Sequence, residues 1–292
     1  MYPGPIERYF APTTLAAALQ LLAEHRGKAR LIAGGQSLMP MLKLRLVETQ
    51  CLIDLNRIEE LAAIREEATG LSLGSMVRHA EVAANPLIRE RYPILADAAR
   101  TIGDPQIRNR GTIGGSLVHA DPAADYPAVV LALNALLTLT KSKAESRTVP
   151  ASEFLRAPMV TDIREDELLT TIRLPMPAQH SGGAYEKTPI VAGDFGIVSV
   201  AAQLAFDSGG RCEHARIVIG NAASGSTLAA RASALLAGAR LEDALCARAA
   251  ETAAGEVEVN SDIRASASYR RELIKSLVPR MIRRAQERAG GA

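Results

Sequence analysis

Residues 31–40 read Leu-Ile-Ala-Gly-Gly-Gln-Ser-Leu-Met-Pro, and this stretch decides how the fold begins. Its apolar start predicts a buried strand, the two glycines end that strand, and an amphipathic helix is expected from Leu38 to Leu46. The glycines let another group approach the backbone, and Ser37 is expected to cap the helix. A strand, a Gly-Gly turn and a helix N-terminus together suit a phosphate or pyrophosphate, although this pattern more often marks a simple tight turn.

The flanking segments complete a β-α-β unit. An amphipathic helix is expected over residues 13–25, with Thr13 as its N-cap, and a second strand over Cys51–Leu55. The helix that follows Ser37 lies between two strands, and its length suits a parallel crossover. The chain is therefore expected to begin with a small parallel unit whose first turn carries the two glycines.

After this unit the sequence no longer predicts alternating strands and helices of a parallel unit. Residues 62–64 and 71–74 predict the arms of a hairpin around a turn at Glu67–Gly70. The segment from Gly103 to Ser116 has little apolar periodicity and several glycine and proline breaks, so a loop is expected there. Helices are expected at residues 79–84, 93–102 and 127–136, and strands of a mixed sheet at 137–140, 147–149 and 168–174.

A domain boundary is expected near Pro175-Met176-Pro177, followed by a flexible stretch at residues 179–183. We expect two domains, residues 1–176 (with subdomains of about 1–57 and 58–176) and residues 177–292. The second domain is expected to hold three antiparallel strands and three alanine-rich helices. The strands are expected at 184–187, 198–206 and 215–220, with a turn at 207–210, and the helices at about 226–237, 241–254 and 267–288.

Composition excludes several function classes. The chain has 292 residues, of which 48% are hydrophobic and 3% aromatic, so aliphatic side chains must fill its core. A net charge of +2, with no basic run interleaved with aromatics, argues against a nucleic-acid partner. Arginines gather near the end of the chain and suggest either a solvated helix face or a surface for a protein partner: Arg270, Arg271, Arg280, Arg283, Arg284 and Arg288.

The three cysteines, Cys51, Cys212 and Cys246, form no close pair. This fits a reducing cytoplasm and argues against both a disulfide framework and an iron–sulfur cluster held within this chain. Residues 1–5 lack the basic and apolar regions of a signal peptide, and no apolar run approaches the roughly 20 residues of a membrane span. A cytoplasmic location is therefore expected.

A second glycine-rich segment, Gly111-Thr-Ile-Gly-Gly-Ser116, repeats the chemistry of the first. Two such loops can grip both phosphates of a dinucleotide through backbone N–H groups, which favours the phosphate interpretation over either loop alone. Asp125 follows and could accept hydrogen bonds from a ribose or ribityl hydroxyl, or cap the helix near Pro127. For Asp121, which precedes Pro122, capping is the favoured role.

Several common site motifs are absent. Neither glycine loop reads G-x-G-x-x-G, and the chain has no Walker A sequence and no H-E-x-x-H. The five histidines show no metal-ligand spacing, and no nucleophile–base pair stands out. We therefore assign no catalytic residue and no metal site, and conclude that the motifs concern the binding of a cofactor.

The motif set resembles one known family. Ala33–Ser37, Thr112–Ser116, Asp121–Asp125, Leu168–Pro175 and Gly193–Phe195 fall in order and at matching spacing. Together they resemble the medium, FAD-binding subunit of the molybdenum hydroxylases, over essentially the whole chain. That family includes carbon monoxide dehydrogenase, the bacterial N-heteroaromatic hydroxylases and the middle portion of xanthine dehydrogenase.

The resemblance implies an α+β fold. A two-loop FAD-binding domain of the vanillyl-alcohol-oxidase/PCMH type, made of two α/β subdomains, would be followed by a three-stranded antiparallel sheet with a helical bundle. It also implies an oxidoreductase whose FAD takes electrons from two [2Fe–2S] clusters on a small subunit and passes them to an external acceptor. A large subunit would carry molybdopterin, and the complex would be a dimer of heterotrimers.

Site roles follow from the same resemblance. Both loops would hold the FAD pyrophosphate, Asp125 would bind the sugar or ribityl region, and the backbone of Leu169 would approach the flavin or adenine. Lys187 would lie near the isoalloxazine, whereas without the resemblance an exposed strand charge is favoured. Phe195 stands where some relatives have tyrosine and keeps a stacking surface without the hydroxyl. The full set of implied FAD-binding residues is Leu31, Ile32, Ala33, Gly34, Gly35, Gln36, Ser37, Leu38, Ile102, Thr112, Ile113, Gly114, Gly115, Ser116, Asp125, Leu169, Lys187 and Phe195.

Three alternatives stay open at this point. A self-contained flavin oxidase could use the same FAD-binding fold, but it needs a substrate pocket with a base beside the flavin, and no such base stands out. A scaffold that binds a nucleotide only structurally is the non-enzymatic alternative. Gln36 could contact the cofactor or merely cap the turn.

Overall fold

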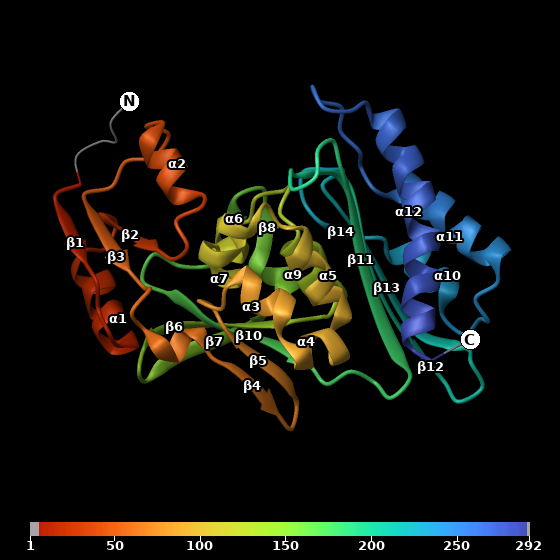
Figure 1. The fold of residues 1–292 in the computed structure, drawn as a ribbon, viewed down its shortest axis with the longest axis horizontal. Helices are drawn as coiled ribbons and strands as arrows, with labels where there is room; N and C mark the ends of the chain where they lie inside the picture. The colour runs from red at the N-terminus through yellow and green to blue at the C-terminus, as the bar shows by residue number, and fades with distance from the viewer. Residues whose placement is uncertain (1–5, 291–292) are drawn as a thin grey trace.

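The computed structural model describes residues 6–290, so the expectation for the signal-peptide region at residues 1–5 lies outside the described residues. Within them, the chain forms a three-stranded, a five-stranded, a four-stranded and a two-stranded sheet. Figure 1 shows the small N-terminal unit at one end, the C-terminal helices at the other, and the five-stranded sheet with its helices between them.

The N-terminal unit has the expected parallel architecture. Its strands β1 (Arg8–Phe10), β3 (Cys51–Asp54) and β2 (Ala29–Ile32) pair in that order, and all pairs are parallel. The predicted β-α-β crossover from β2 through α2 (Leu38–Lys43) to β3 is confirmed. The apolar face of α1 (Leu15–Glu24) supplies Ala18, Leu19 and Leu22 to the core of this unit.

Three details of this unit were predicted wrongly. Thr14, not Thr13, caps α1, because its hydroxyl accepts a hydrogen bond from the Ala17 N–H at 3.2 Å. Helix α2 ends at Lys43, well before Leu46, and Ser37 makes no side-chain capping bond. Ser37 already has helical φ and ψ, whereas a capping side chain normally sits on an extended residue.

The five-stranded sheet has the order β4 (Ile64–Glu67), β5 (Gly70–Gly74), β10 (Leu168–Pro175), β6 (Leu136–Ser142) and β7 (Glu145–Pro150). The predicted hairpin β4–β5 is confirmed. Every pairing is antiparallel, so the expectation of a mixed sheet is wrong. The strand segments were found from their apolar residues, but strand direction depends on the connections, and these carry no sequence signal of their own. Between β7 and β10 lie α9 (Ala151–Phe154), β8 (Leu155–Ala157) and β9 (Val160–Thr161).

Short helices cover this sheet, and two of them correct the sequence prediction. The segment expected to be a loop, Gly103–Ser116, contains α6 (Pro105–Arg110) and the start of α7 (Ile113–His119). Each helix has a capping residue: Asp104 accepts from the Ile107 N–H, and Thr112 accepts from the Gly115 N–H. Short helices with good caps can form without apolar periodicity. The others are η1 (Glu59–Ala62), α3 (His79–Ala84), α4 (Pro86–Arg91), α5 (Pro93–Thr101) and α8 (Tyr126–Ala132).

The C-terminal sheet has four strands rather than the expected three. Strands β11 (Ser181–Pro189), β12 (Gly196–Phe206) and β13 (Cys212–Gly220) form the predicted antiparallel meander. A fourth strand, β14 (Thr227–Leu228), is too short to leave an alternating pattern in the sequence. The stretch expected to be flexible is ordered from Ser181, because Gly182 lets β11 approach a C-terminal helix so closely that any Cβ would collide with the Ala285 carbonyl.

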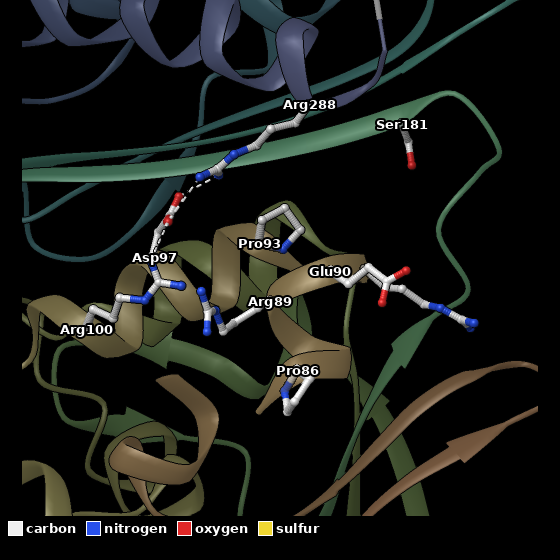
Figure 2. Close-up of a pocket in the computed structure, with 9 residues that line it drawn as sticks. Pro86, Arg89, Glu90, Pro93, Asp97, Arg100, Ser181 and Arg288 are labelled. Atoms are coloured by element: carbon white, nitrogen blue, oxygen red, sulfur yellow. Dashed lines mark hydrogen bonds and ion pairs between the residues drawn. The ribbon is translucent and has the colours of Figure 1, made fainter. Parts of the chain in front are cut away.

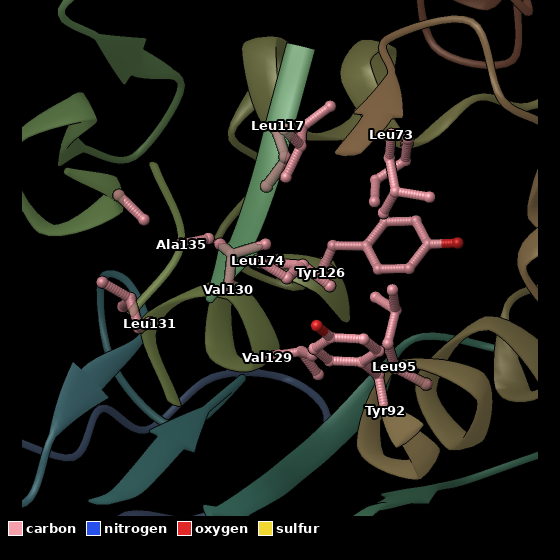
Figure 3. Close-up of a cluster of buried hydrophobic side chains, with 14 of the residues drawn as sticks. Leu73, Tyr92, Leu95, Leu117, Tyr126, Val129, Val130, Leu131, Ala135 and Leu174 are labelled. Atoms are coloured by element: carbon pink, nitrogen blue, oxygen red, sulfur yellow. The ribbon is translucent and has the colours of Figure 1, made fainter. Parts of the chain in front are cut away.

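The four-stranded sheet is buried on both faces. Alternate residues face opposite ways, so Tyr185, Ala201 and Val218 belong to the large core under the five-stranded sheet. Their neighbours Val200 and Ile217 pack in a separate core with the three expected C-terminal helices. These are α10 (Ala230–Leu236), α11 (Asp243–Glu256) and α12 (Ala267–Arg288), which Figure 1 shows beyond the sheet. Figure 3 shows the large core, in which Tyr126 of α8 lies among Leu73, Leu95, Val129 and Leu174.

The C-terminal arginines mainly bind their own chain. Arg280, Arg283, Arg284 and Arg288 each form an ion pair with an acidic side chain of this protein. Arg270, expected on a solvated or partner-facing surface, is 4% exposed. Its guanidinium donates to the Ile197 and Asn221 carbonyls at 2.9 and 2.6 Å and to the Asp262 carboxylate at 2.6 Å. It therefore fixes α12 to the ends of β12 and β13.

We predict that Arg270→Met lowers the free energy of unfolding of the FAD-free chain by about 3 kcal/mol, because two buried carbonyls lose their donor. Urea unfolding followed by circular dichroism measures this change. Arg271→Met is the matched control, because Arg271 is exposed and should change stability by less than about 0.5 kcal/mol. Equal effects of the two substitutions would contradict this role of Arg270.

Candidate cofactor-binding site

The two glycine-rich segments meet in the structure. We call Ala33–Ser37 the first loop and Thr112–Ser116 the second loop. Gly34 lies directly against the backbone of Arg110 and Gly111, so that any Cβ there would overlap both residues. A Cβ on Gly115 would lie 3.6 Å from the Cβ of Ala33. Segments far apart in the sequence thus form one continuous surface, as the dinucleotide hypothesis requires.

The first loop presents unused backbone donors. The N–H groups of Gly34, Gly35, Gln36 and Ser37 have no hydrogen-bond acceptor among residues 6–290. Gly35 has φ +74°, a left-handed conformation that a glycine adopts without strain. Consecutive backbone N–H groups before a helix form an anion-binding concavity, so the first loop can bind a phosphate. Gln36 is exposed, and its side chain makes no hydrogen bond within the described part of the chain, so the turn-capping role is not observed.

The second loop differs from the first because four of its five N–H groups, all except that of Thr112, are already occupied. Gly114 donates to the Ser75 carbonyl and Gly115 to the Thr112 hydroxyl, while Ile113 and Ser116 donate to other backbone carbonyls. Gly115 is exposed, and Ser116 is partly exposed. The second loop therefore offers the Ser116 hydroxyl, the close approach allowed by Gly115 and the single N–H of Thr112, rather than the row of backbone N–H groups that its sequence suggested.

Asp125 and Lys187 form a buried ion pair. The Asp125 carboxylate accepts from Lys187 Nζ at 3.1 Å and from the Tyr185 hydroxyl at 2.6 Å, and it makes no capping bond to α8. Lys187 is only 8% exposed, so the alternative of an exposed strand charge is wrong. Burial raises the pKa of Asp125, and the facing Lys187 ammonium and Tyr185 hydroxyl oppose that shift. An ammonium has three donor hydrogens, so Lys187 keeps donors for another group.

Asp121, for which capping was favoured, accepts a hydrogen bond from the Ala123 N–H at 2.8 Å and so closes a local turn before Asp125. This part of the chain is also tied to the C-terminal sheet. Asn221 at the end of β13 donates to the Ala123 carbonyl at 2.6 Å and accepts from the Ser199 hydroxyl at 2.5 Å. The Asp125–Lys187 pair and these bonds join the turn before α8 to β11, β12 and β13.

Ile102 and Phe195 come from segments that touch each other. A Cβ on Gly193 would lie 3.3 Å from the carbonyl oxygen of Gly103, the residue after Ile102. Arg108 of α6 donates to the carbonyls of Ile102 and Gly103 at 3.0 and 2.8 Å and fixes this turn. Phe195 is 47% exposed, so its ring can cover a bound group.

Leu169 lies near the start of β10, next to the second loop. Its side chain is buried in the large core, so only its backbone can face a ligand. The pairing of β10 with β5 stops at Thr171, and the next carbonyl, Thr170, accepts from the Ser75 N–H at 3.0 Å. The Ser75 carbonyl in turn accepts from Gly114, so this end of β10 lies next to the second loop.

One part of the site gave no signal in the sequence. The His79 side chain is buried under Gly111, and the His79 backbone N–H donates to the Gly111 carbonyl at 3.1 Å. Burial, together with the nearby Arg78 and Arg108, lowers the pKa of His79 to about 4, so the imidazole is neutral at physiological pH. It therefore supports the second loop without adding a charge beneath it.

A surface pocket lies away from the two loops and shares no residue with either. Its volume is about 470 Å³, and it lies between α4, α5 and the end of α12. Figure 2 shows Asp97 facing Arg288, which donates to it at 2.6 Å, with Arg89 and Arg100 nearby. These contacts hold α12 against α5.

Comparison with known proteins identifies the family. Residues 5–177 match the FAD binding domain in molybdopterin dehydrogenase, and residues 183–285 match the CO dehydrogenase flavoprotein C-terminal domain. The chain is 36% identical over 288 residues to the carbon monoxide dehydrogenase medium chain of Hydrogenophaga pseudoflava, covering 99% of each protein. It is 36% identical over 281 residues to the 6-hydroxypseudooxynicotine dehydrogenase complex subunit alpha of Paenarthrobacter nicotinovorans, covering 96% of this chain and 95% of that one.

Solved structures agree with this result. A chain of carbon monoxide dehydrogenase from Hydrogenophaga pseudoflava, in a form that lacks the Mo-pyranopterin moiety, matches with a TM-score of 0.93 and 38% identity over 99% of both chains. A chain of quinoline 2-oxidoreductase from Pseudomonas putida 86 matches with a TM-score of 0.92 and 36% identity over 99% of both chains.

The protein therefore belongs to the family of FAD-binding subunits of molybdopterin dehydrogenases. It is an oxidoreductase subunit whose cofactor is FAD, as the resemblance of the motifs implied. Within residues 6–290, no helix has both the length and the apolar character needed to cross a membrane.

The residues present fit FAD. The unused N–H groups of the first loop suit one phosphate, and the Ser116 hydroxyl of the adjoining loop suits the other. Arg78 and Arg110 supply positive charge close to the two loops. Burial is the main cause of the lowered pKa of Arg78, and repulsion from the nearby Arg110 charge is the second.

We predict that Gly34→Ala raises the Kd of the FAD-free chain for FAD at least about tenfold, because the new methyl group forces the two loops apart. Titration with FAD, followed by flavin fluorescence, measures this. Gly255→Ala is the matched control, because a Cβ at Gly255 in α11 meets no other atom within 4 Å. Unchanged FAD affinity in Gly34→Ala would show that the contact of the two loops does not shape the site.

Proposed function

We propose that this chain is the electron-transfer subunit of a heterotrimeric molybdenum hydroxylase. Its FAD receives electrons from [2Fe–2S] clusters on a small partner subunit and passes them to an external acceptor, while a large partner subunit carries molybdopterin. The observation that carries the proposal is the contact of the two glycine loops within a chain that matches medium chains of such dehydrogenases over its whole length.

The proposal assigns a role to each part of the site. The first and second loops hold the pyrophosphate, with Leu31, Ile32 and Leu38 as the immediate flanks of the first. Asp125 faces the sugar or ribityl hydroxyls, and the backbones of Ile102 and Leu169 line the pocket. Phe195 covers one face of the flavin, and Lys187 lies beside the isoalloxazine.

Lys187 is suited to this position because of its partner. Asp125 neutralises part of its charge and, with Tyr185, holds its side chain in a fixed position. The remaining ammonium donors can face the N1–C2=O side of the isoalloxazine and stabilise negative charge there. When bound, FAD supplies a carrier that accepts electrons singly and releases them in pairs.

The proposal also covers the architecture and the assembly. We assign residues 1–176 to a FAD-binding domain of the PCMH type, with two subdomains, and residues 177–292 to the C-terminal domain. We further propose a dimer of heterotrimers in the cytoplasm. All three cysteines are buried and free, which fits a reducing compartment.

The experiment that tests this function has two parts. The purified chain should bind about one FAD, with a flavin absorption spectrum that dithionite bleaches and air restores. In the assembled complex, substrate should bleach the same flavin, whereas substrate added to this chain alone should leave it oxidised. Purification without FAD, and no uptake of added FAD, would overturn the proposal.

The same measurements separate the alternatives. Bleaching of the flavin in the isolated chain by a small alcohol or amine would identify a self-contained flavin oxidase. A bound flavin that cannot be reduced reversibly would identify a protein that holds the nucleotide only as a structural element.

A further inference from the structure

The two loops are connected by a chain of side-chain hydrogen bonds that belongs to neither loop. Asn56, just after β3, donates from Nδ2 to the carbonyl of Ala33 in the first loop at 2.9 Å. Its Oδ1 accepts from Arg78 Nη2 at 2.5 Å. Arg78 then donates through Nη1 to the carbonyl of Arg110, immediately before the second loop. The path therefore runs from Ala33 through Asn56 and Arg78 to Arg110.

Asp54 anchors this path at Asn56. The Asp54 carboxylate accepts from both the side chain and the backbone N–H of Asn56, the latter at 2.9 Å, and from the Tyr9 hydroxyl at 2.5 Å. Burial alone would raise the pKa of Asp54, but these hydrogen bonds outweigh it and lower the pKa. Asp54 is therefore ionised near neutral pH and fixes the orientation of the Asn56 amide.

The residue types suit a spacer between two segments. A guanidinium has several donors in a rigid plane, so Arg78 can hold two acceptors from different segments at a fixed separation. The Asn56 amide donates with one end and accepts with the other, which is what an intermediate position in such a path requires. Neither residue belongs to the glycine motifs, and the two lie on opposite sides of the β4–β5 hairpin in the sequence.

We propose that Asn56 and Arg78 are positioning residues that set the distance between the first and second loops, and thereby the fit of the FAD pyrophosphate. The proposal rests on the proposed function, in which both loops contact that pyrophosphate. Arg78 acts through the Asn56 side chain and the Arg110 carbonyl, and these two hydrogen bonds, rather than its charge alone, provide the effect. The Gly34 contact brings the loops together, and the Asn56–Arg78 path keeps them from sliding along each other.

The experiment is a double-mutant cycle on the full chain. The Kd for FAD is measured by fluorescence titration of the FAD-free wild type, Arg78→Met, Asn56→Ala and the double variant. Each single substitution should raise the Kd about tenfold. The double variant should bind about as weakly as the single variants, because either substitution already breaks the same path.

Three further variants separate positioning from charge and from folding. Arg78→Lys keeps the charge but loses the rigid fork, so its Kd should stay raised. Asn56→Asp keeps an acceptor for Arg78 but loses the donor to Ala33, so it should also bind FAD weakly, even if Arg78→Met fails to fold. Arg65→Met, at an exposed arginine in β4, is the matched control and should bind FAD like the wild type.

The outcomes distinguish this proposal from the proposed function. A wild type that binds no FAD would refute the function itself. If the wild type binds FAD, then unchanged affinity in Arg78→Met and Asn56→Ala would overturn the positioning role. Recovery of affinity in Arg78→Lys, or effects that multiply in the double variant, would also overturn it, because charge or independent contacts would then be responsible.

Discussion

The contact between Gly34 and the backbone of Arg110 and Gly111 is the constraint on which the cofactor site depends. Two backbones approach this closely only where one of them carries no side chain. The contact places the unused N–H groups of the first loop beside Thr112–Ser116, although the first loop follows a strand of the three-stranded sheet and the second begins helix α7. Two separately weak phosphate motifs become one candidate site because the fold brings them into contact here.

A second constraint lies where the C-terminal sheet meets the turn before α8. Asp125, Tyr185 and Lys187 bury two opposite charges and satisfy them with each other. A buried charge without its partner would be costly, so this pair ties the position of β11 to that of α8. The residue assigned to the flavin, Lys187, is thus fixed by a residue assigned to the sugar region. Both assignments depend on the same interface between the N-terminal part and the C-terminal sheet.

Much of this fold could be predicted from the sequence, where the patterns were local and long. The bounds of α12 and α3, the β4–β5 hairpin and the parallel crossover from β2 to β3 followed from periodicity, glycine turns and prolines. Helix α6 was missed because it buries no residue and depends on its cap Asp104, and α7 because its apolar face is only Ile113 and Leu117 behind the cap Thr112. Strand β14 has two residues and therefore no alternation to detect.

The sequence motifs predicted which segments form the candidate site, but not which of their hydrogen-bond donors are free or which side chains hold the segments together. The sequence predicted backbone donors in both glycine loops, whereas the structure leaves a row of them unused in the first loop and only that of Thr112 in the second. It also gave no sign of Asn56, Arg78 or His79, because these residues act through tertiary contacts with backbone carbonyls and carry no motif. Lys187 was placed by resemblance alone, since its partner Asp125 is distant in the sequence.

A crystal structure of the full chain with FAD would show whether the two loops together bind the diphosphate. If both loops bind the FAD pyrophosphate, the diphosphate lies within about 3 Å of the N–H groups of Gly34–Ser37 and beside the Ser116 hydroxyl of the second loop. The Ala33 and Arg110 carbonyls should also keep their bonds to Asn56 and Arg78. A diphosphate bound elsewhere, such as in the pocket of Arg89, Arg100 and Arg288, with the first loop facing solvent, would contradict the account.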